Sequence, residues 1–193
     1  MKYKNKYRIE TTRAPWWDYG ASALYFVTIC CKNRVCWFGD VANGEMCLSH
    51  IGQITKNEWL KTFDMRPDMN LWMGEYVVMP NHFHAVIGIG ANPYNTPRDT
   101  QPDTQRRDAM HCVSTDGGTI PKNKFGPQSK NLASIVRGFK IGVTTNARKI
   151  NPDFQWQARY HDHIIRNEES FSNISHYIKD NPSKWELDKF FNT

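Results

Sequence analysis

The sequence contains no apolar run that approaches the roughly 20 residues of a membrane-spanning helix. It also lacks the pattern of a signal peptide, because the basic start at 1–13 is followed by Trp16, Trp17 and Asp18 instead of an apolar stretch. The five cysteines are odd in number and show no paired CxxC spacing, so we expect reduced thiols, several of them in the core. Together these absences predict a cytoplasmic protein with no membrane partner.

Acidic residues are the minority charge, with 19 Asp and Glu against 25 Lys and Arg, a net charge of +6 and a pI near 9.1. This excess favours an anionic partner such as nucleic acid, although many basic proteins bind nothing anionic. The length fits one domain, and no internal repeat divides the chain. We therefore expect a single domain over 1–193. Its basic start at 1–20 is either an arm suited to phosphates or a solvated tail.

Apolar patterns along the chain predict alternating strands and helices. The predicted strands lie at 24–30, 69–79, 82–89 and 154–165. Asn43-Gly44 predicts a hairpin turn between two short apolar pieces. The predicted helices lie at 48–63, at 132–143 and between Asn167 and Pro182. This order predicts an α+β sandwich in which helices pack on a central antiparallel sheet.

A long polar segment at about 91–128 separates the two halves of the chain, and we expect it to be a loop that is functional or mobile. Basic side chains in the N-terminal arm, in this loop and on the second helix are candidates for DNA phosphate contacts, with simple solvation as the alternative. These candidates are Lys4, Lys6, Arg8, Arg106, Arg107, Arg137 and Lys140.

Two histidines flank a phenylalanine in His82-Phe83-His84, at the start of a predicted strand. Because residues i and i+2 of a strand point to the same face, both imidazoles can converge on one ion while Phe83 packs into the core. Two imidazoles leave room for an oxygen ligand and for substrate phosphate oxygens at a divalent cation. Two ordinary histidines at a strand start are the alternative explanation.

Tyr177 and Asn181 lie one turn apart on the last predicted helix. Phe171, Ile174 and Ile178 have the spacing of a core-facing stripe, and Tyr177 belongs to the neighbouring polar stripe. Its hydroxyl can therefore point outward, with the Asn181 amide on the same side. This pattern fits either a nucleophile beside an amide ligand of a metal or a boundary tyrosine with a surface hydroxyl.

Six segments occur together in one order, and the resemblance that they carry extends over nearly the whole chain apart from the extreme N-terminus and the polar loop. They are YFVTICCKNR (25–34), the stretch 39–51, EYVVMPNHFHAVIGI (75–89), SIVRGFK (134–140), QWQARYHDHIIRNE (155–168) and YIKDNPSKWELDK (177–189). This set closely resembles the REP-associated tyrosine transposases, a branch of the HUH single-tyrosine transposases. The resemblance implies a ferredoxin-like or RRM-like sandwich, which agrees with the order of elements predicted above.

The resemblance also implies roles for individual residues. His82 and His84 match the family's metal-binding pair, in which a hydrophobic residue separates two histidines. Tyr177 matches the catalytic tyrosine, and Asn181 stands where related enzymes place an amide that joins the histidines at the metal. His163 falls in a family motif and is a weaker candidate, with a structural or supporting role expected before that of a ligand.

The expected function is that of a metal-dependent, single-stranded DNA endonuclease and strand transferase that cleaves next to DNA hairpins. A divalent cation, Mg²⁺ or Mn²⁺, would orient the scissile phosphate, because a phenol with an ordinary pKa near 10 is a poor nucleophile at neutral pH. Tyr177 would form a 5′-phosphotyrosine bond that a 3′-hydroxyl can reverse without ATP. The partner would be hairpin-containing single-stranded DNA, bound by a monomer or a homodimer.

Two alternatives belong to other classes. A domesticated hairpin-DNA-binding protein would keep the fold without strand transfer, although the intact His82, His84 and Tyr177 argue against it. A small metal-dependent phosphodiesterase would use water as the nucleophile and would form no covalent species.

Overall fold

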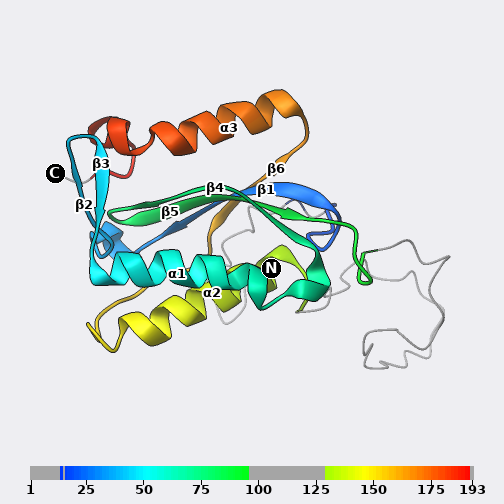
Figure 1. Cartoon of the computed structure of the whole chain (residues 1–193), viewed down its shortest axis with the longest axis horizontal. Helices are drawn as coiled ribbons and strands as arrows, with labels where there is room; N and C mark the ends of the chain where they lie inside the picture. Colours follow the sequence, from blue (N-terminus) through cyan, green and yellow to red (C-terminus); the bar gives the residue numbers. More distant parts are fainter. Residues whose placement is uncertain (1–13, 15, 96–128, 192–193) are drawn as a thin grey trace, which may run out of the picture.

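A four-stranded antiparallel sheet lies at the centre of the protein (Figure 1). The computed structural model describes residues 14, 16–95 and 129–191. The strands of the sheet are β1 (Ala23–Cys30), β4 (Leu71–Met79), β5 (His82–Ile89) and β6 (His161–Ile165), in the spatial order β4-β5-β1-β6. The α-helices of these residues are α1 (His50–Asp64), α2 (Leu132–Ala147) and α3 (Glu168–Asp180).

The chain order β1-α1-β4-β5-α2-β6 combined with this strand order is the ferredoxin-like arrangement. Helices α1 and α2 cover one face of the sheet, and α3 covers the opposite face (Figure 1). The structure therefore confirms the predicted α+β sandwich with a central antiparallel sheet.

Strand β5 is buried along its whole length because both of its faces are covered. On one face the ring of Phe83 packs against Trp59 of α1 and Phe139 of α2, with ring centroids 5.0 and 5.1 Å away. His82 and His84 alternate with Phe83 and therefore point to the other face, toward α3. As predicted, Phe83 packs into the core, and the two histidines share the other face of the strand.

Each α-helix begins at a side chain that accepts a backbone N–H of its first turn. Ser49 caps α1, Asn131 caps α2 in a reciprocal capping box with Ser134, and Asn167 caps α3 as predicted. Such caps stabilise a helix by about 1 kcal/mol each because they satisfy donors that have no partner inside the helix. Helix α3 ends at Asp180, and a short 3₁₀ helix, η5 (Pro182–Leu187), follows it.

The predicted hairpin is present as β2 (Gly39–Ala42) and β3 (Glu45–Leu48), which pair with each other in a separate small sheet. Asn43 and Gly44 both have positive φ angles, 53° and 77°, as a two-residue primed turn requires. This hairpin stands at the same end of the molecule as η5 and the C-terminal segment (Figure 1).

The predicted strand at 154–165 is wrong over its first half, since β6 covers only His161–Ile165. The aromatic residues before β6 contribute to packing and not to strand pairing. Phe154 is fully buried in the core, and Trp156 forms only an isolated bridge with Cys31. Arg159 has a φ of 66°, a left-handed conformation that no regular strand contains. The segment is therefore irregular until His161.

Several other predictions can be compared with the described residues. Their cysteines, two of them buried, are all free thiols, as expected. Trp17 and Tyr19, at the end of the predicted arm, pack against the core. None of the described helices has the length and apolar character needed to cross a bilayer. The DNA-contact candidates Lys4, Lys6, Arg8, Arg106 and Arg107, the polar loop beyond residue 95 and Cys112 lie outside the described residues.

Candidate functional site

The imidazole rings of His82 and His84 lie side by side on the face of the sheet that α3 covers. Their ring centroids are 4.5 Å apart, and both side chains are almost completely buried. Burial lowers the pKa of His84 from 6.5 to about 3 and also lowers the pKa of His82 well below its usual value. Both rings are therefore neutral at physiological pH, the form in which imidazole binds metals.

The tautomer of His82 follows from its neighbour Asn81. The amide nitrogen of Asn81 donates to the carbonyl oxygen of Phe190 at 2.8 Å, which turns its amide oxygen toward Nδ1 of His82 at 2.9 Å. Nδ1 must therefore carry the proton and donate, so the lone pair of His82 lies on Nε2. That buried nitrogen has no hydrogen-bond partner among the described residues.

His84 is held between a threonine and a tyrosine. Its Nδ1 lies 2.8 Å from Oγ1 of Thr28 on the neighbouring strand β1, and its Nε2 lies 3.2 Å from the phenol oxygen of Tyr177. The ring of Phe26 stacks on the imidazole at a centroid distance of 5.3 Å. Strand register explains this packing, because Thr28 pairs directly with His84 and points to the same face.

Tyr177 reaches the histidine pair from α3. Ile178 anchors the helix in an apolar cluster with Val86 and Ile165, and Phe171 and Ile174 pack against this cluster, as the sequence predicts. The neighbouring position 177 therefore lies at the margin of the buried face, and its side chain is 40% exposed. Burial of the ring and the nearby carboxylate of Asp188 raise the pKa of the Tyr177 phenol above 10.0.

Asp188 completes the cluster, and sequence reasoning missed it. One carboxylate oxygen accepts from the Asn181 amide nitrogen at 3.2 Å and from the Tyr177 hydroxyl at 3.4 Å, while the other accepts from the backbone N–H of Phe190 at 2.7 Å. The residue follows η5, beyond Pro182, so the helical periodicity of α3 could not place it. Its only sequence signal is its position inside the segment 177–189.

These side chains fit a divalent cation. One potential ligand atom from each of His82, His84 and Asp188 lies within 4.8 Å of the other two. Two neutral imidazoles and a carboxylate suit Mn²⁺ and also accommodate Mg²⁺. Asn181 is 3% exposed, and its amide oxygen, like Nε2 of His82, is a buried atom without a hydrogen-bond partner in the described part of the chain. Such atoms are costly unless a ligand satisfies them.

His163 lies on the same face of the sheet as the histidine pair but is not part of the cluster. It is exposed on strand β6, opposite Phe26, and lines a groove of about 480 Å³ together with His161, Asn173 and Ile174. This groove adjoins the site, because Phe26 lines it and also contacts both His84 and Tyr177. Aromatic and imidazole rings therefore extend from the phenol along β6.

The two described DNA-contact candidates, Arg137 and Lys140, lie elsewhere. Both belong to α2, which covers the opposite face of the sheet from Tyr177 (Figure 1). The ammonium of Lys140 donates to the backbone carbonyls of Gln157 and Arg159 at 2.8 and 3.1 Å. The histidine–tyrosine cluster and these cations therefore form two separate regions of the molecule.

Comparison with solved structures identifies the fold. The structure of a REP-associated tyrosine transposase bound to a REP hairpin matches with a TM-score of 0.56 and 18% sequence identity, over 94% of this chain and 77% of that one. A crystal structure of a candidate transposase from Deinococcus radiodurans matches with a TM-score of 0.42 and 13% identity, over 89% of this chain and 97% of that one. The first of these matches shows that the protein has the fold of the REP-associated tyrosine transposases, as the motifs predicted.

The comparison of sequences adds a closer relative. No model of a known protein family matches the chain. An uncharacterized protein of Haemophilus influenzae is 36% identical over 182 residues, which cover 91% of this chain and 88% of that protein. The chain belongs to the same family as this Haemophilus influenzae protein.

Proposed function

We propose that this protein is a metal-dependent DNA strand transferase of the transposase type, with Tyr177 as its nucleophile. The observation that carries the proposal is the convergence of Tyr177, His82 and His84 within a single chain, with the phenol oxygen 3.2 Å from an imidazole nitrogen. A boundary tyrosine with a surface hydroxyl would not be expected to contact a buried, neutral histidine of such a pair. The proposed ligands of the cation are His82 and His84, joined by Asp188 or Asn181.

The chemistry follows from the groups present. A divalent cation bound here would neutralise charge on the scissile phosphate and polarise the phosphorus centre. The oxygen of Tyr177 attacks phosphorus, the bond from phosphorus to the 3′-oxygen of the upstream strand breaks, and that oxygen leaves as a 3′-hydroxyl after taking a proton. The phenol loses its own proton and becomes a 5′-phosphotyrosine ester. A free 3′-hydroxyl can reverse this step, so strands can be rejoined without ATP.

The nucleophile needs this activation, because burial and Asp188 raise the pKa of its phenol. The remaining residues orient it. Ile178 fixes the helix on the sheet, and Phe26 meets the ring of Tyr177 edge to face at a centroid distance of 6.2 Å. Since Tyr177 and the histidines come from one chain, we propose that the tyrosine acts on the site of its own subunit.

The proposed substrate is single-stranded DNA beside a hairpin. The REP-associated tyrosine transposase that shares this fold was solved bound to a REP hairpin. In this chain, the groove next to Tyr177 presents Phe26, His161 and His163, and rings of this kind stack on unpaired bases without requiring a particular sequence. In a duplex the bases stack on one another and are not free to stack on these rings, so the groove favours a single strand.

A covalent-adduct assay tests the proposal. The protein is incubated with Mn²⁺ or Mg²⁺ and labelled hairpin oligonucleotides taken from sequences that flank its gene, and the products are separated on a denaturing gel. We expect a labelled protein band that Tyr177→Phe abolishes and that a chelator prevents. His50→Gln is the control variant, since this exposed histidine belongs to α1, which covers the opposite face of the sheet from Tyr177.

The outcomes separate the three functions. An adduct that persists in Tyr177→Phe would show that another residue is the nucleophile. Released DNA product without any adduct would support a phosphodiesterase that uses water. Hairpin binding that needs no metal and leads to no cleavage would support the domesticated DNA-binding protein.

A further inference from the structure

Arg34 and Tyr177 lie on different sides of the histidine pair. The phenol oxygen of Tyr177 contacts Nε2 of His84 at 3.2 Å. The ring of Phe190 lies closer to the other histidine, since its centroid is 4.5 Å from that of His82 and 5.9 Å from that of His84. The guanidinium of Arg34 stacks on the ring of Phe190, with Cζ 4.0 Å from the ring centroid. The phenol therefore lies at the His84 end of the site and the guanidinium at the His82 end.

The pairing of β1 with β5 supports this placement of Arg34. Residues that pair directly in a sheet point to the same face, and Cys30 of β1 pairs directly with His82. The guanidinium of Arg34 donates a hydrogen bond to the sulfur of Cys30. Burial, the neighbouring His84 and the positive charge of Arg34 lower the pKa of His82, in that order. Arg34 thus lies beside His82 on the face of the sheet that carries the site.

The backbone of the turn after β1 fixes the position of Arg34. Asn33 and Arg34 have φ angles of 54° and 57°, a left-handed conformation that is uncommon for residues other than glycine. The backbone N–H of Cys31, where the turn begins, donates to the carbonyl of Asn81 at 2.8 Å, directly before His82. Backbone strain of this kind persists where the surrounding structure holds it, and it is concentrated at functional sites. The turn therefore fixes the guanidinium relative to the histidine pair.

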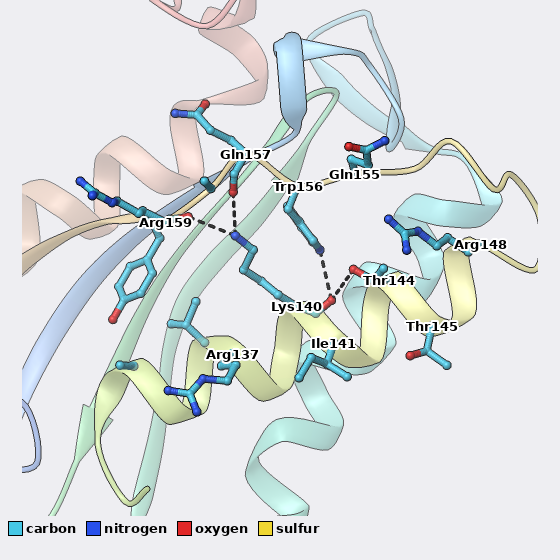
Figure 2. A pocket seen from close by; sticks show the side chains of 14 residues that line it. Arg137, Lys140, Ile141, Thr144, Thr145, Arg148, Gln155, Trp156, Gln157 and Arg159 are labelled. Carbon is cyan, nitrogen blue, oxygen red and sulfur yellow. Dashed lines mark hydrogen bonds between the residues drawn. The ribbon is translucent and has the colours of Figure 1, made fainter. Parts of the chain in front are cut away.

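A cavity of about 480 Å³ lies beside Arg34. It is lined by Lys32, Asn33, Arg34 and the segment 155–158, and none of these residues is acidic. The volume is within the range of pockets that hold small ligands, so a single nucleotide fits. Figure 2 shows how Lys140 of α2 holds the segment: its ammonium donates to the carbonyl of Gln157 at 2.8 Å, and its carbonyl accepts from the indole nitrogen of Trp156 at 3.3 Å. The site therefore has space for a nucleotide next to the guanidinium.

In-line displacement makes the His82 end of the site the side of the leaving group. The attacking and leaving oxygens lie roughly opposite each other across the phosphorus atom. When Tyr177 attacks from the side of His84, the 3′-oxygen departs on the side of His82, toward Arg34. Negative charge develops on that oxygen as its bond to phosphorus breaks. A guanidinium suits this position, because it stays protonated and presents several N–H donors in a fixed geometry.

We propose that Arg34 is a catalytic residue that donates a hydrogen bond to the departing 3′-oxygen. The proposal rests on the proposed function for the identity of the reaction. As the oxygen of Tyr177 bonds to phosphorus, the electron pair of the breaking bond passes to the 3′-oxygen, which takes a proton from water. Arg34 keeps its own protons and stabilises the developing charge. In the reverse reaction the same contact holds the 3′-hydroxyl beside the phosphotyrosine.

A substrate whose leaving group needs little stabilisation tests this role. The cleavage position is mapped with the unaltered protein, and two hairpin oligonucleotides are then compared that carry either oxygen or sulfur as the bridging 3′-atom at that phosphate. The readout is the rate at which the labelled upstream strand is released in a single turnover with Mn²⁺. Sulfur is much the better leaving atom, since a thiol has a pKa of about 8.5.

We expect Arg34→Gln to slow release from the oxygen substrate about 100-fold or more, the usual cost of removing one donor to a developing negative charge. Release from the sulfur substrate should slow far less, so the ratio of the two rates should change at least about tenfold. A merely structural role for Arg34 would slow both substrates alike.

Two controls address charge and the integrity of the site. Lys32→Gln removes one charge from the same turn, where the ammonium of Lys32 donates to Oε1 of Gln155 at 2.8 Å, and it should leave the ratio of the two rates unchanged. The affinity of Arg34→Gln for Mn²⁺ in calorimetric titration should not fall, because Arg34 is not part of the potential ligand cluster. A lower affinity would show that Arg34 acts by shaping the metal site, and it would overturn the proposal.

Equal slowing of both substrates in Arg34→Gln would also overturn the proposal, and so would the absence of any slowing. Release of the upstream strand is measured whichever group attacks, so the result can be told apart from that of the adduct assay. If the Tyr177 adduct forms but the ratio does not change, only the role of Arg34 is wrong. If the ratio changes while Tyr177→Phe still releases the strand, the leaving-group role stands and the nucleophile is another group. If the unaltered protein releases no strand, both proposals fail.

Discussion

Nε2 of His84 lies 3.2 Å from the phenol oxygen of Tyr177, and Nδ1 of the same ring is engaged by Thr28. Nε2 is also the nitrogen of His84 that a cation would use, and it cannot contact the phenol and bind a cation at the same time. Binding of a cation therefore has to release the phenol from His84. The cation would thus replace the phenol at His84 and free the Tyr177 hydroxyl when the site becomes able to bind a phosphate.

Replacing Tyr177 by phenylalanine is therefore expected to preserve cation binding. Phenylalanine has no hydroxyl to contact Nε2 of His84, so the affinity for Mn²⁺ in calorimetric titration should be equal to or higher than that of the unaltered protein. His82→Ala should lower the affinity at least tenfold, because it removes a nitrogen whose lone pair is unengaged. Loss of Mn²⁺ binding in Tyr177→Phe would show instead that the phenol oxygen is itself a ligand.

Asn81 is expected to control the cation affinity through the tautomer of His82. In Asn81→Ala the proton on Nδ1 of His82 loses its acceptor. The ring can then also adopt the tautomer with the proton on Nε2, which cannot bind a cation through that nitrogen. Loss of an interaction that orients a ligand typically lowers metal affinity about 10–100-fold. Asn81→Asp keeps an acceptor for Nδ1 and should restore most of the affinity, although it gives up the bond to the Phe190 carbonyl. Equal affinity in the alanine and aspartate variants would contradict this role.

The histidine pair and its partner strand could be predicted because the relevant signals are local. Alternation along 82–89 places both imidazoles on one face, and the periodicity of α3 places Tyr177 beside the apolar stripe. Asp188 could not be found in this way, because Pro182 ends the helical pattern of α3. Asp188 follows the 3₁₀ helix η5, whose direction the pattern of α3 does not predict. Only tertiary packing brings Asp188 within reach of Asn181.

The segment before β6 shows the other limit of sequence reasoning. Phe154 and Trp156 are aromatic residues typical of a strand, but they pack against Phe38 and Phe139 and do not form a regular strand pairing. The cleft that this irregular segment forms with α2 depends on the bonds of Lys140 to two backbone carbonyls. Hydrogen bonds from a side chain to distant backbone carbonyls leave no periodic pattern in the sequence from which they could be predicted.

Anchoring of α3 by Ile178 is expected to matter for stability and for the position of the nucleophile. Ile178 is 1% exposed and packs against Val86 and Ile165 of the sheet. Ile178→Ala should lower the free energy of unfolding by about 2–5 kcal/mol, and Ile178→Val by about 0.5–1.5 kcal/mol. Urea denaturation measures both changes. Ile141→Ala on the exposed face of α2 is the matched control and should change the stability by well under the cost at Ile178.

Stability without metal is expected to fall as the pH falls below about 6.5. Burial lowers the pKa of His84 in the folded protein to about 3, whereas the unfolded chain has the ordinary value of 6.5. Between these two pH values His84 binds a proton in the unfolded state but not in the folded state. The stabilisation by neutral His84 is therefore complete above pH 6.5 and is lost as the pH falls toward 3. The buried His82 acts in the same direction.

From about pH 7.5 to about pH 5.5, His84 alone should account for a loss of about 1.4 kcal/mol in the free energy of unfolding. Urea denaturation at both pH values, in the presence of a chelator, measures this loss, and His84→Gln should show a loss that is smaller by that amount. His163→Gln removes an exposed imidazole and controls for the substitution itself. If His84→Gln and the unaltered protein lose the same stability over this interval, the buried imidazole is not held in its neutral form by the fold.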